Sequence, residues 1–232
     1  MTAAALTIRD LSLRSVVVPL PRPLVTRVVT IDKAAFVLID LETEEGVTGR
    51  AYLFGYTPAG NACFAPALRW LRDAMKGEAV EPERLFLKAR KALTLMGHEG
   101  IAMMAVSGFD MACWDAFAKT QGKPLVEVLG GEPGPVPAYN SNGLGLIGPE
   151  AAAEEAKELI REGNFKAVKV RLGRETLDDD LAVLGSVRDA VAPFILLPVD
   201  FNQGLDVEEA IRRGHFLVNV YVHWIQEPVR FD

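Results

Sequence analysis

The spacing of hydrophobic and polar positions changes along the chain, and this change predicts two kinds of architecture. Residues 6–18, 34–43 and 50–56 are rich in β-branched or alternating apolar positions. Glycine and proline clusters separate these runs, which predicts a three-stranded antiparallel meander. The segment P-L-P-R-P-L at 19–24 is too rich in proline for regular structure, and we expect a loop there.

Helical patterns follow the predicted meander. Residues 66–76 are amphipathic, a second helix is expected to start near Pro82, and residues 101–120 form a long, mostly apolar helical pattern. Asp110 and Asp115 interrupt the apolar face of the long helix. Local capping or pairing is a more common role for such carboxylates than catalysis, and we favour it here.

Beyond a linker at 130–137, short apolar strands alternate with helices. The predicted strands are 136–141, 166–171 and 195–200, and the predicted helices are 149–162 and 178–191. This alternation predicts right-handed βαβ units and a parallel sheet.

Two cationic side chains stand close together in the second predicted strand of this half. Lys169 and Arg171 are two residues apart, so a strand places them on one face. An isolated K-x-R is usually a solvated basic edge. The next strand, however, ends in Asp200 and Asn202, which puts a carboxylate one βα unit after the cationic pair. Because the C-terminal strand ends carry the chemistry in α/β barrels, this order favours a functional site.

Composition narrows the class of protein. The chain has 232 residues, half of them hydrophobic, and a formal net charge of −6 without a long basic run, which argues against nucleic acid as a partner. We find no signal-peptide pattern and no apolar run of membrane-spanning length. Cys63 and Cys113 fit neither a disulfide framework nor a zinc motif, and the three histidines make no metal spacing. We therefore expect a cytoplasmic protein that does not bind membranes.

A second motif offers a different interpretation. Gly143, Gly145 and Gly148 spell G-x-G-x-x-G between a strand and a helix, which is the context of a dinucleotide site. That fold places an acidic residue about 20 residues later. This chain has Lys169 and Arg171 instead, which would at best suit the 2′-phosphate of NADP. The polar end of the preceding strand also disagrees with a Rossmann strand. A glycine loop over a barrel mouth is the plainer interpretation.

The order of the motifs resembles the mandelate racemase and muconate lactonizing enzyme family of the enolase superfamily, most closely its mandelate racemase branch. The segments that carry the likeness are V-P-L at 18–20, V-L-I-D-L at 37–41, Y-L-F-G-Y-T-P at 52–58, F-D-M-A-C-W-D-A at 109–116, K-V-R at 169–171, D-F-N at 200–202 and W-I-Q-E-P at 224–228. The resemblance implies an α+β capping domain over residues 1–132. A TIM-like (β/α)7β barrel would begin at 134–232, with about its first four strands in this chain.

The resemblance also implies a reaction. Such enzymes remove the α-proton of a carboxylate, and Mg2+ stabilises the enediolate as a Lewis acid. Of the residues in this chain, Asp200 matches the first metal ligand, and Lys169 matches the first lysine of the family's K-x-K, which steadies the substrate carboxylate. The positions that match substrate-binding residues are Ser141 and Asn202 near the carboxylate, and Leu24, Ile31 and Tyr56 in cap loops.

Three departures from the family pattern change what we expect. The second metal ligand falls on Gln226, a neutral and weaker donor, and not on Glu227. The second lysine of K-x-K, a base in the racemase, is Arg171, whose guanidinium stays protonated at working pH. The barrel part is also short, so we expect the third ligand and the His-Asp pair on strands outside the chain. The β-branched run at 214–224 is unusual where a barrel helix should lie.

These observations lead to one functional hypothesis and its alternatives. We expect a mandelate racemase-like enzyme acting on a hydroxy-carboxylate, as a dehydratase of acid sugars or as a racemase. We expect this chain to be an incomplete and inactive form that binds Mg2+ weakly or not at all, and to form homo-oligomers. The alternatives are a catalytically dead fragment that serves as a binding or assembly module and, less favoured, an NADP-binding Rossmann-type protein.

Overall fold

The computed structural model describes residues 5–220 and 222–231, and they form two compact units, each with its own hydrophobic core. The first unit comprises the chain up to residue 19 together with 33–135, and the second comprises 20–32 together with the chain from 136 onward. The segment 20–32 therefore belongs to the second unit, although it lies far from the rest of that unit in sequence.

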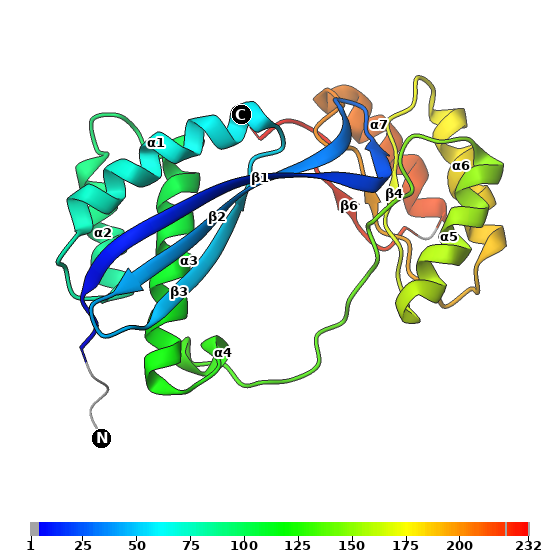
Figure 1. Cartoon of the computed structure of the whole chain (residues 1–232). Coiled ribbons are helices and arrows are strands. Elements are labelled where there is room, and N and C mark those ends of the chain that lie inside the picture. Colours follow the sequence, from blue (N-terminus) through cyan, green and yellow to red (C-terminus); the bar gives the residue numbers. More distant parts are fainter. Residues whose placement is uncertain (1–4, 221, 232) are drawn as a thin grey trace. The chain divides into compact units, whose positions relative to one another are not determined.

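A three-stranded sheet forms one layer of the first unit. The strands β1 (Ile8–Val25), β2 (Thr30–Thr43) and β3 (Thr48–Phe54) lie in the order β1-β2-β3, as Figure 1 shows. β2 and β3 are antiparallel, with Ile39 opposite Ala51. Alternate residues of β2 are buried, so one face of the sheet packs on the core. The predicted meander is confirmed.

The prolines of the 19–24 segment do not interrupt β1, and the expectation of a loop there was wrong. Pro19, Pro21 and Pro23 occupy every second position of an edge strand, and all three are exposed. Alternate residues of a strand direct their N–H groups to the same side, so prolines at this spacing remove donors on one side only. An edge strand tolerates this loss when that side faces away from its neighbour.

The first helix is longer than the amphipathic pattern predicted. α1 spans Pro58–Met75, and the Thr57 side chain caps it by accepting a hydrogen bond from the N–H of Gly60. Pro66, where we expected the helix to begin, lies inside it on the exposed side. The cap at Thr57 followed by proline was the correct start signal.

α3 (Ile101–Gln121) is the central helix of the first unit. It packs against β3, α1 and α2 (Pro82–Ala92), and the short α4 (Leu125–Val128) follows it. Within the described chain α3 alone is long and apolar enough to cross a membrane, contrary to our expectation that no segment reaches that length. Its contacts with the sheet and two helices explain its apolar sequence, because a helix buried on several sides needs apolar residues all round.

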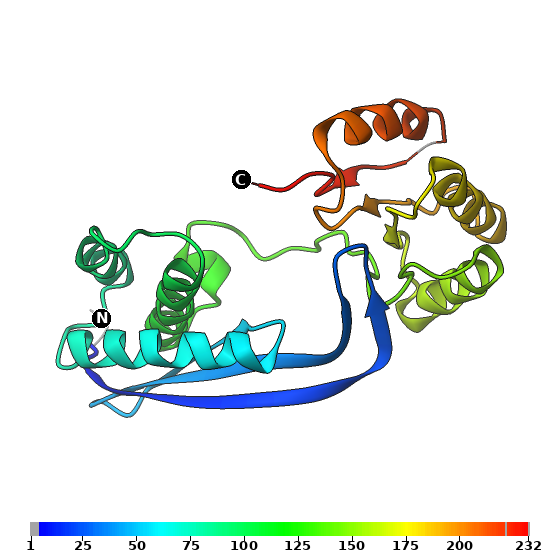
Figure 2. The same ribbon diagram turned by 90° about the horizontal axis from the view of Figure 1, so that it is seen from above.

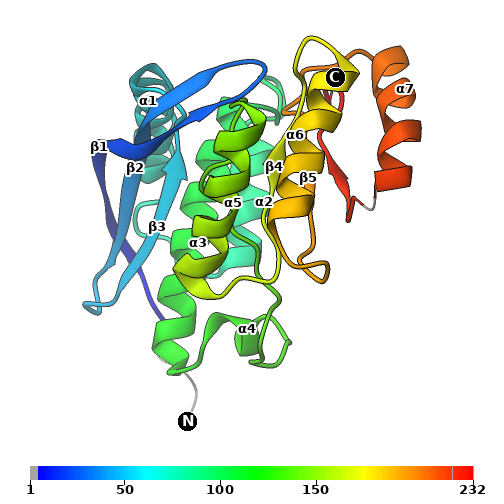
Figure 3. The same cartoon turned by 90° about the vertical axis from the view of Figure 1, so that its right-hand side faces the viewer.

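Parallel βα units build the second unit. Its elements are α5 (Pro149–Gly163), β4 (Val170–Arg171), α6 (Leu177–Ala190), β5 (Val199–Asp200), α7 (Val207–Leu217), the 3-10 helix η1 (Val218–Val220) and β6 (Ile225–Gln226). The strands lie in the order β4-β5-β6 and are parallel. Figures 2 and 3 show α5 and α6 along one side of these strands, with α7 continuing the series. The predicted alternation and the parallel sheet are confirmed.

Two predicted features of the second unit take a different form. The expected strand at 136–141 is reduced to one parallel bridge, between Asn140 and Val168. The β-branched run at 214–224 begins in α7, which follows the Asp206 cap and extends to Leu217, and continues through η1 to Val220. Residue 221 of that run lies outside the described residues.

Candidate functional site

Successive side chains along β4 and the residues before it point to opposite faces, so apolar residues lie on one face and charged residues on the other. Val168 and Val170 are fully buried in the core that α5 and α6 cover. Lys169 and Arg171 direct their side chains to the other side of the strand and are nevertheless 6% and 5% exposed. Burying two cations costs free energy unless they are paired or hydrogen-bonded, so their partners define the site.

Lys169 joins the three strands at one point. Its ammonium lies 2.8 Å from Oδ2 of Asp200 and donates to Oε1 of Gln226 at 3.3 Å. The strand register explains this meeting, because Arg171 is opposite Asp200 and Asp200 is opposite Gln226. The structure therefore brings together the K-x-R pair, the acid of β5 and the amide of β6, as the sequence order predicted.

Asn202 completes the surroundings of the Asp200 carboxylate. Its N–H donates to Oδ1 at 2.8 Å, and its side-chain amide donates to Oδ2 at 3.2 Å. Asn202 has a left-handed backbone with φ 48°, which asparagine tolerates better than most residues. Its Oδ1 is buried without a hydrogen-bond partner among the described residues, so an additional donor could bind there.

The Arg171 guanidinium holds the loop that follows the bridge between Asn140 and Val168. Nη1 donates to the carbonyls of Gly143 at 2.6 Å and Ser141 at 3.2 Å. Its Nε is buried without a partner in the described part of the chain, and burial lowers the pKa of Arg171 from its ordinary value. Ser141 thus contributes its carbonyl to this contact.

Tyr139 is a neighbour of this cluster that our sequence reasoning missed. Its ring centroid lies 5.9 Å from the Lys169 ammonium, and it packs edge-to-face on Trp224. The signal was present in the sequence, because Tyr139 is two residues before Ser141 and so shares its face in an extended segment.

The cap-loop residues are placed in different units. Leu24 and Ile31 are half-buried in the segment 20–32 of the second unit. Tyr56 belongs to the first unit, where its exposed ring packs against Phe54 with centroids 4.5 Å apart. Substrate contact by these three residues stays a prediction.

The two aspartates of α3 differ. Asp115 pairs with Lys119 and accepts the N–H of Arg50 at 2.7 Å, which confirms its local role. Asp110 was expected to cap or pair as well, but its Oδ1 is buried without a partner in the described chain. Burial raises the pKa of Asp110 to about 6.

The donor set is a poor fit to a magnesium site. Mg2+ prefers an octahedral shell of oxygen ligands and keeps waters it cannot replace. Here the cluster offers one carboxylate, Asp200, and one amide oxygen, Gln226, and the Lys169 ammonium already binds both. No group of three His, Cys, Asp or Glu residues that could hold a metal occurs in the described chain. These residues alone do not provide the expected site.

The glycine motif lies under the segment 20–32. A Cβ at Gly145 would come within 2.8 Å of the Val25 carbonyl, and one at Gly143 within 3.0 Å of the Arg22 and Glu155 side chains. Leu146 donates its N–H to that same carbonyl. These glycines therefore allow the segment 20–32 to approach closely. This packing explains the glycine motif without a bound dinucleotide.

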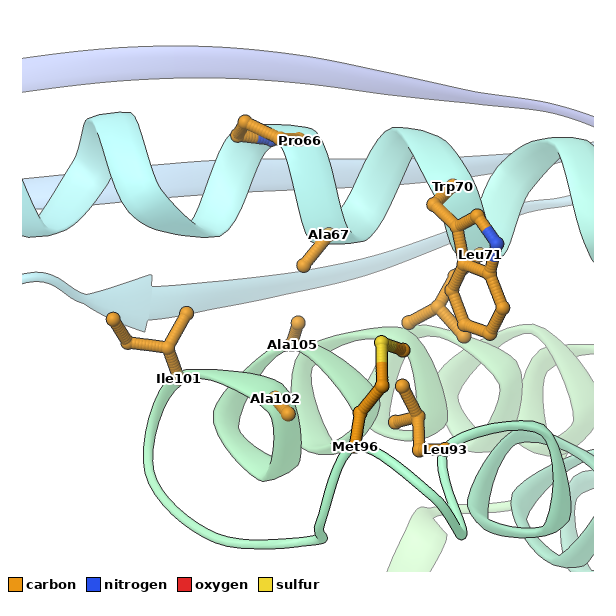
Figure 4. Close-up of a pocket in the computed structure, with 9 residues that line it drawn as sticks. All are labelled: Pro66, Ala67, Trp70, Leu71, Leu93, Met96, Ile101, Ala102 and Ala105. Carbon is orange, nitrogen blue, oxygen red and sulfur yellow. The ribbon is translucent and has the colours of Figure 1, made fainter.

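An apolar cavity of about 500 Å³ lies in the first unit, as Figure 4 shows. It is lined by Pro66, Ala67, Trp70, Leu71, Leu93, Met96, Ile101, Ala102 and Ala105. Since none of these side chains titrates, the cavity offers no acid, base or metal ligand.

Comparison with protein families matches both parts of the chain. Residues 8–130 match the N-terminal domain of mandelate racemase / muconate lactonizing enzyme, and residues 151–232 match the enolase C-terminal domain-like family. Among curated proteins, the L-talarate/galactarate dehydratase of Salmonella typhimurium is 27% identical over 197 residues, covering 85% of this chain and 50% of its own length. The chain spans about half the length of the curated relatives it matches.

Solved structures agree with this assignment. An enolase from the alphaproteobacterium BAL199 with bound Mg is 45% identical, with a TM-score of 0.94, and the match covers 98% of this chain and 63% of that one. An enolase from Bradyrhizobium, complexed with magnesium and mandelic acid, is 36% identical with a TM-score of 0.90, over 99% of this chain and 63% of its own. The α+β capping domain followed by part of a (β/α) barrel is thereby confirmed.

Proposed function

Since the chain belongs to the mandelate racemase / muconate lactonizing enzyme family, we propose that it carries part of the active site of an enzyme that removes the α-proton of a hydroxy-carboxylate. Curated relatives include acid-sugar dehydratases, cycloisomerases and epimerases. The family resemblance implies a first step in which a proton next to a carboxylate is removed, and a buried cationic pair suits the negative charge that would develop there.

The arginine at position 171 supports a more specific proposal about the reaction. Racemisation requires a base on each face of the α-carbon, and a guanidinium, which stays protonated at working pH, is a poor base. Its hydrogen bonds to the Ser141 and Gly143 carbonyls hold it as a fixed positive charge. A single base on the opposite face is enough for β-elimination of water. We therefore favour a dehydratase of acid sugars or related hydroxy acids.

Racemase activity is the competing proposal, and the likeness to a solved relative complexed with mandelic acid favours it. In that case a group other than Arg171 would serve as the second base. In both reactions Lys169 and Arg171 would hold or stabilise the carboxylate, and Ser141, Asn202, Leu24, Ile31 and Tyr56 would contact the substrate.

Mg2+ would supply Lewis-acid stabilisation of the enediolate, with Asp200 and Gln226 as this chain's contribution. Because the cluster holds one carboxylate and is already neutralised by Lys169, we propose that the 232-residue chain binds Mg2+ weakly or not at all and is inactive by itself. We propose that the protein is cytoplasmic and forms homo-oligomers. A role as a catalytically dead binding or assembly module is the alternative for the chain alone.

Deuterium exchange tests the reaction class. The full-length gene product is incubated with each enantiomer of a 2-hydroxy acid in D2O, and α-deuterium and loss of water are followed by NMR. We expect exchange from one enantiomer or dehydration, and Arg171→Lys should open exchange on the second face. Comparable deuterium entry into both enantiomers of the wild type would require two working bases and contradict the dehydratase proposal.

A further inference from the structure

In the described part of the chain, the segment 173–175, shortly after β4, is held by charged side chains and not by other backbone groups. The N–H of Gly173 donates to both oxygens of Asp180, at 2.9 and 3.0 Å, and the N–H of Arg174 donates to Oδ1 at 3.0 Å. Asp180 lies in the first turn of α6 and is completely buried. A single carboxylate thus fixes two successive amides of the loop that follows Arg171.

Asp180 is itself part of a buried ion cluster that reaches α7. Arg213, which is 2% exposed, places Nη1 2.5 Å from Oδ2 of Asp180 and 3.0 Å from the Arg174 carbonyl. Its Nη2 donates to the carbonyl of Glu175, and its Nε pairs with Glu209. α6 therefore binds the Gly173 and Arg174 amides of this loop, and α7 binds its Arg174 and Glu175 carbonyls, while Arg27 donates to the Gly173 carbonyl.

The Arg174 side chain extends this cluster to the neighbouring loop, residues 143–148, which we call the glycine loop. Nη2 donates to the Ile147 carbonyl at 2.6 Å and the Gly145 carbonyl at 3.4 Å. Nη1 contacts Oδ1 of Asp180 at 3.3 Å and the Arg171 carbonyl at 3.2 Å. The charged members of the cluster are Arg174, Arg213, Asp180 and Glu209, and Glu209 also pairs with the exposed Arg212.

We infer that Asp180 is a positioning residue that, through Arg174 and Arg213, fixes the glycine loop relative to the end of β4. The same glycine loop supplies the Gly143 carbonyl that holds the Arg171 guanidinium. Among the described residues, no hydrogen bond joins Asp180 to the Lys169–Asp200–Gln226 cluster. Its effect on the site is therefore indirect, through the loop backbone.

A purely stabilising ion pair and a positioning residue give different experimental signatures. Loss of a stabilising pair lowers the free energy of unfolding and speeds exchange of every core amide of the unit together. Loss of the positioning role frees the loops while the core stays protected, because local openings need less free energy than global unfolding. Amide hydrogen exchange, resolved residue by residue by NMR, separates the two.

The first comparison is between the wild type and Asp180→Asn. We expect exchange at Gly173 and Arg174 to accelerate by at least about tenfold, since hydrogen bonds to a charged acceptor are lost or weakened. The amide of Leu146 in the glycine loop should accelerate too. Asp178→Asn is the matched control, because Asp178 lies in the same helical turn but is exposed. This control should leave all three amides unchanged.

A second variant keeps the test decisive if Asp180→Asn fails to fold. Arg174→Met leaves Asp180 paired with Arg213 but removes the contacts to the glycine loop. We expect faster exchange at Leu146 and a shifted, broadened Nε–H resonance of Arg171, with Gly173 protected as in the wild type. Unchanged exchange at Leu146 in Arg174→Met, or acceleration of all core amides of the unit in step, would overturn the positioning role.

The role of the loops in ligand binding rests on the proposed function and is measured separately. Calorimetric titration of the same samples with tartrate, a small hydroxy-carboxylate, should show weaker binding for Arg174→Met than for the wild type. Absence of binding by the wild type would count against the proposed function of this chain. It would not affect the positioning role, which the exchange rates decide alone.

Discussion

At the scale of single residues, the site depends on charges that are buried and therefore need partners. Lys169 and Asp200 are almost completely removed from solvent, and their pairing is a condition for burying either of them. The sequence predicted that these residues share one end of the sheet, because strand periodicity and the order of the βα units determine it. It did not predict that the ammonium would bind Gln226 as well, since that contact depends on side-chain conformation.

Removal of the Lys169 charge should destabilise the second unit. In Lys169→Met the Asp200 carboxylate stays buried without its cation, and we expect a loss of about 3–5 kcal/mol in the free energy of unfolding. Lys157→Met, which breaks an exposed pair with Glu154, is the control and should cost less than about 1 kcal/mol. Urea denaturation measures both. Equal effects in the two variants would show that the buried pair has no special role.

Asp110 should make the first unit less stable as pH rises. Burial raises its folded-state pKa to about 6 from an ordinary value of 3.8, so the folded state holds this proton more tightly than the unfolded state. The contribution is fully present below about pH 4 and is lost as pH rises through 6. Asp110→Asn should therefore be more stable than the wild type at pH 7, by about 1 kcal/mol for a half-buried group.

The difference between Asp110→Asn and the wild type isolates this proton from the other groups that titrate. Urea midpoints measured from pH 4 to 7.5 should diverge with rising pH. Parallel curves would contradict a raised pKa at Asp110. Asp73→Asn, at an exposed and paired carboxylate of α1, serves as the control for adding an amide to the unit.

At the scale of elements, the sequence predicted order and type better than length. The strand and helix order was correct because hydrophobic periodicity reports which face is buried. The start of α1 and the course of β1 were wrong, because prolines were taken as breaks in both places. An edge strand and an exposed helix face tolerate proline, and edge position is a property of the sheet that the sequence of one strand does not contain.

The contact between β3 and α3 depends on two glycines. A Cβ at Gly49 would overlap the Ala112 carbonyl and lie 2.8 Å from the Cβ of Ala116, and one at Gly108 would lie 2.7 Å from Ile39. Gly49→Ala should therefore force the helix from the sheet and cost about 1–3 kcal/mol, as overpacking does. Gly134→Ala, in the same unit with open space around it, is the matched control. A thermal melt showing equal midpoints would contradict the close packing.

At the scale of the whole molecule, the family and the fold were predictable and the reaction was not. Short motifs in a fixed order sufficed for the family, because their order reflects the order of barrel strands. The choice between dehydratase and racemase depends on a base on the opposite face, and no described residue supplies it. The network of Asp180, Arg174 and Arg213 also escaped prediction, since its members match no short motif and meet only where the loop 173–175 binds both α6 and α7.

The exposed edge of the parallel sheet leads us to expect self-association. β6 is an edge strand of the described sheet, and Ile225 on it and Phe216 on α7 are both exposed. Unpaired strand edges with apolar neighbours favour association. Light scattering at micromolar concentration should show oligomers, and Ile225→Lys should reduce their size. Leu87→Lys, at an exposed site on α2, should not. A monomeric wild type would contradict the expectation.

The assignment of residues 20–32 to the second unit has a consequence for the order of events during synthesis. Arg22 pairs with Glu155, and Arg27 donates to the carbonyl of Gly173, so this segment is completed only by partners more than 100 residues later. A ribosome adding about 5–20 residues per second needs roughly 5–30 seconds to make them. During that interval the tip of the β1–β2 hairpin has left the ribosome without the surface it binds. The second unit therefore cannot finish folding from its C-terminal residues alone, because it also needs the segment 20–32 from near the start of the chain.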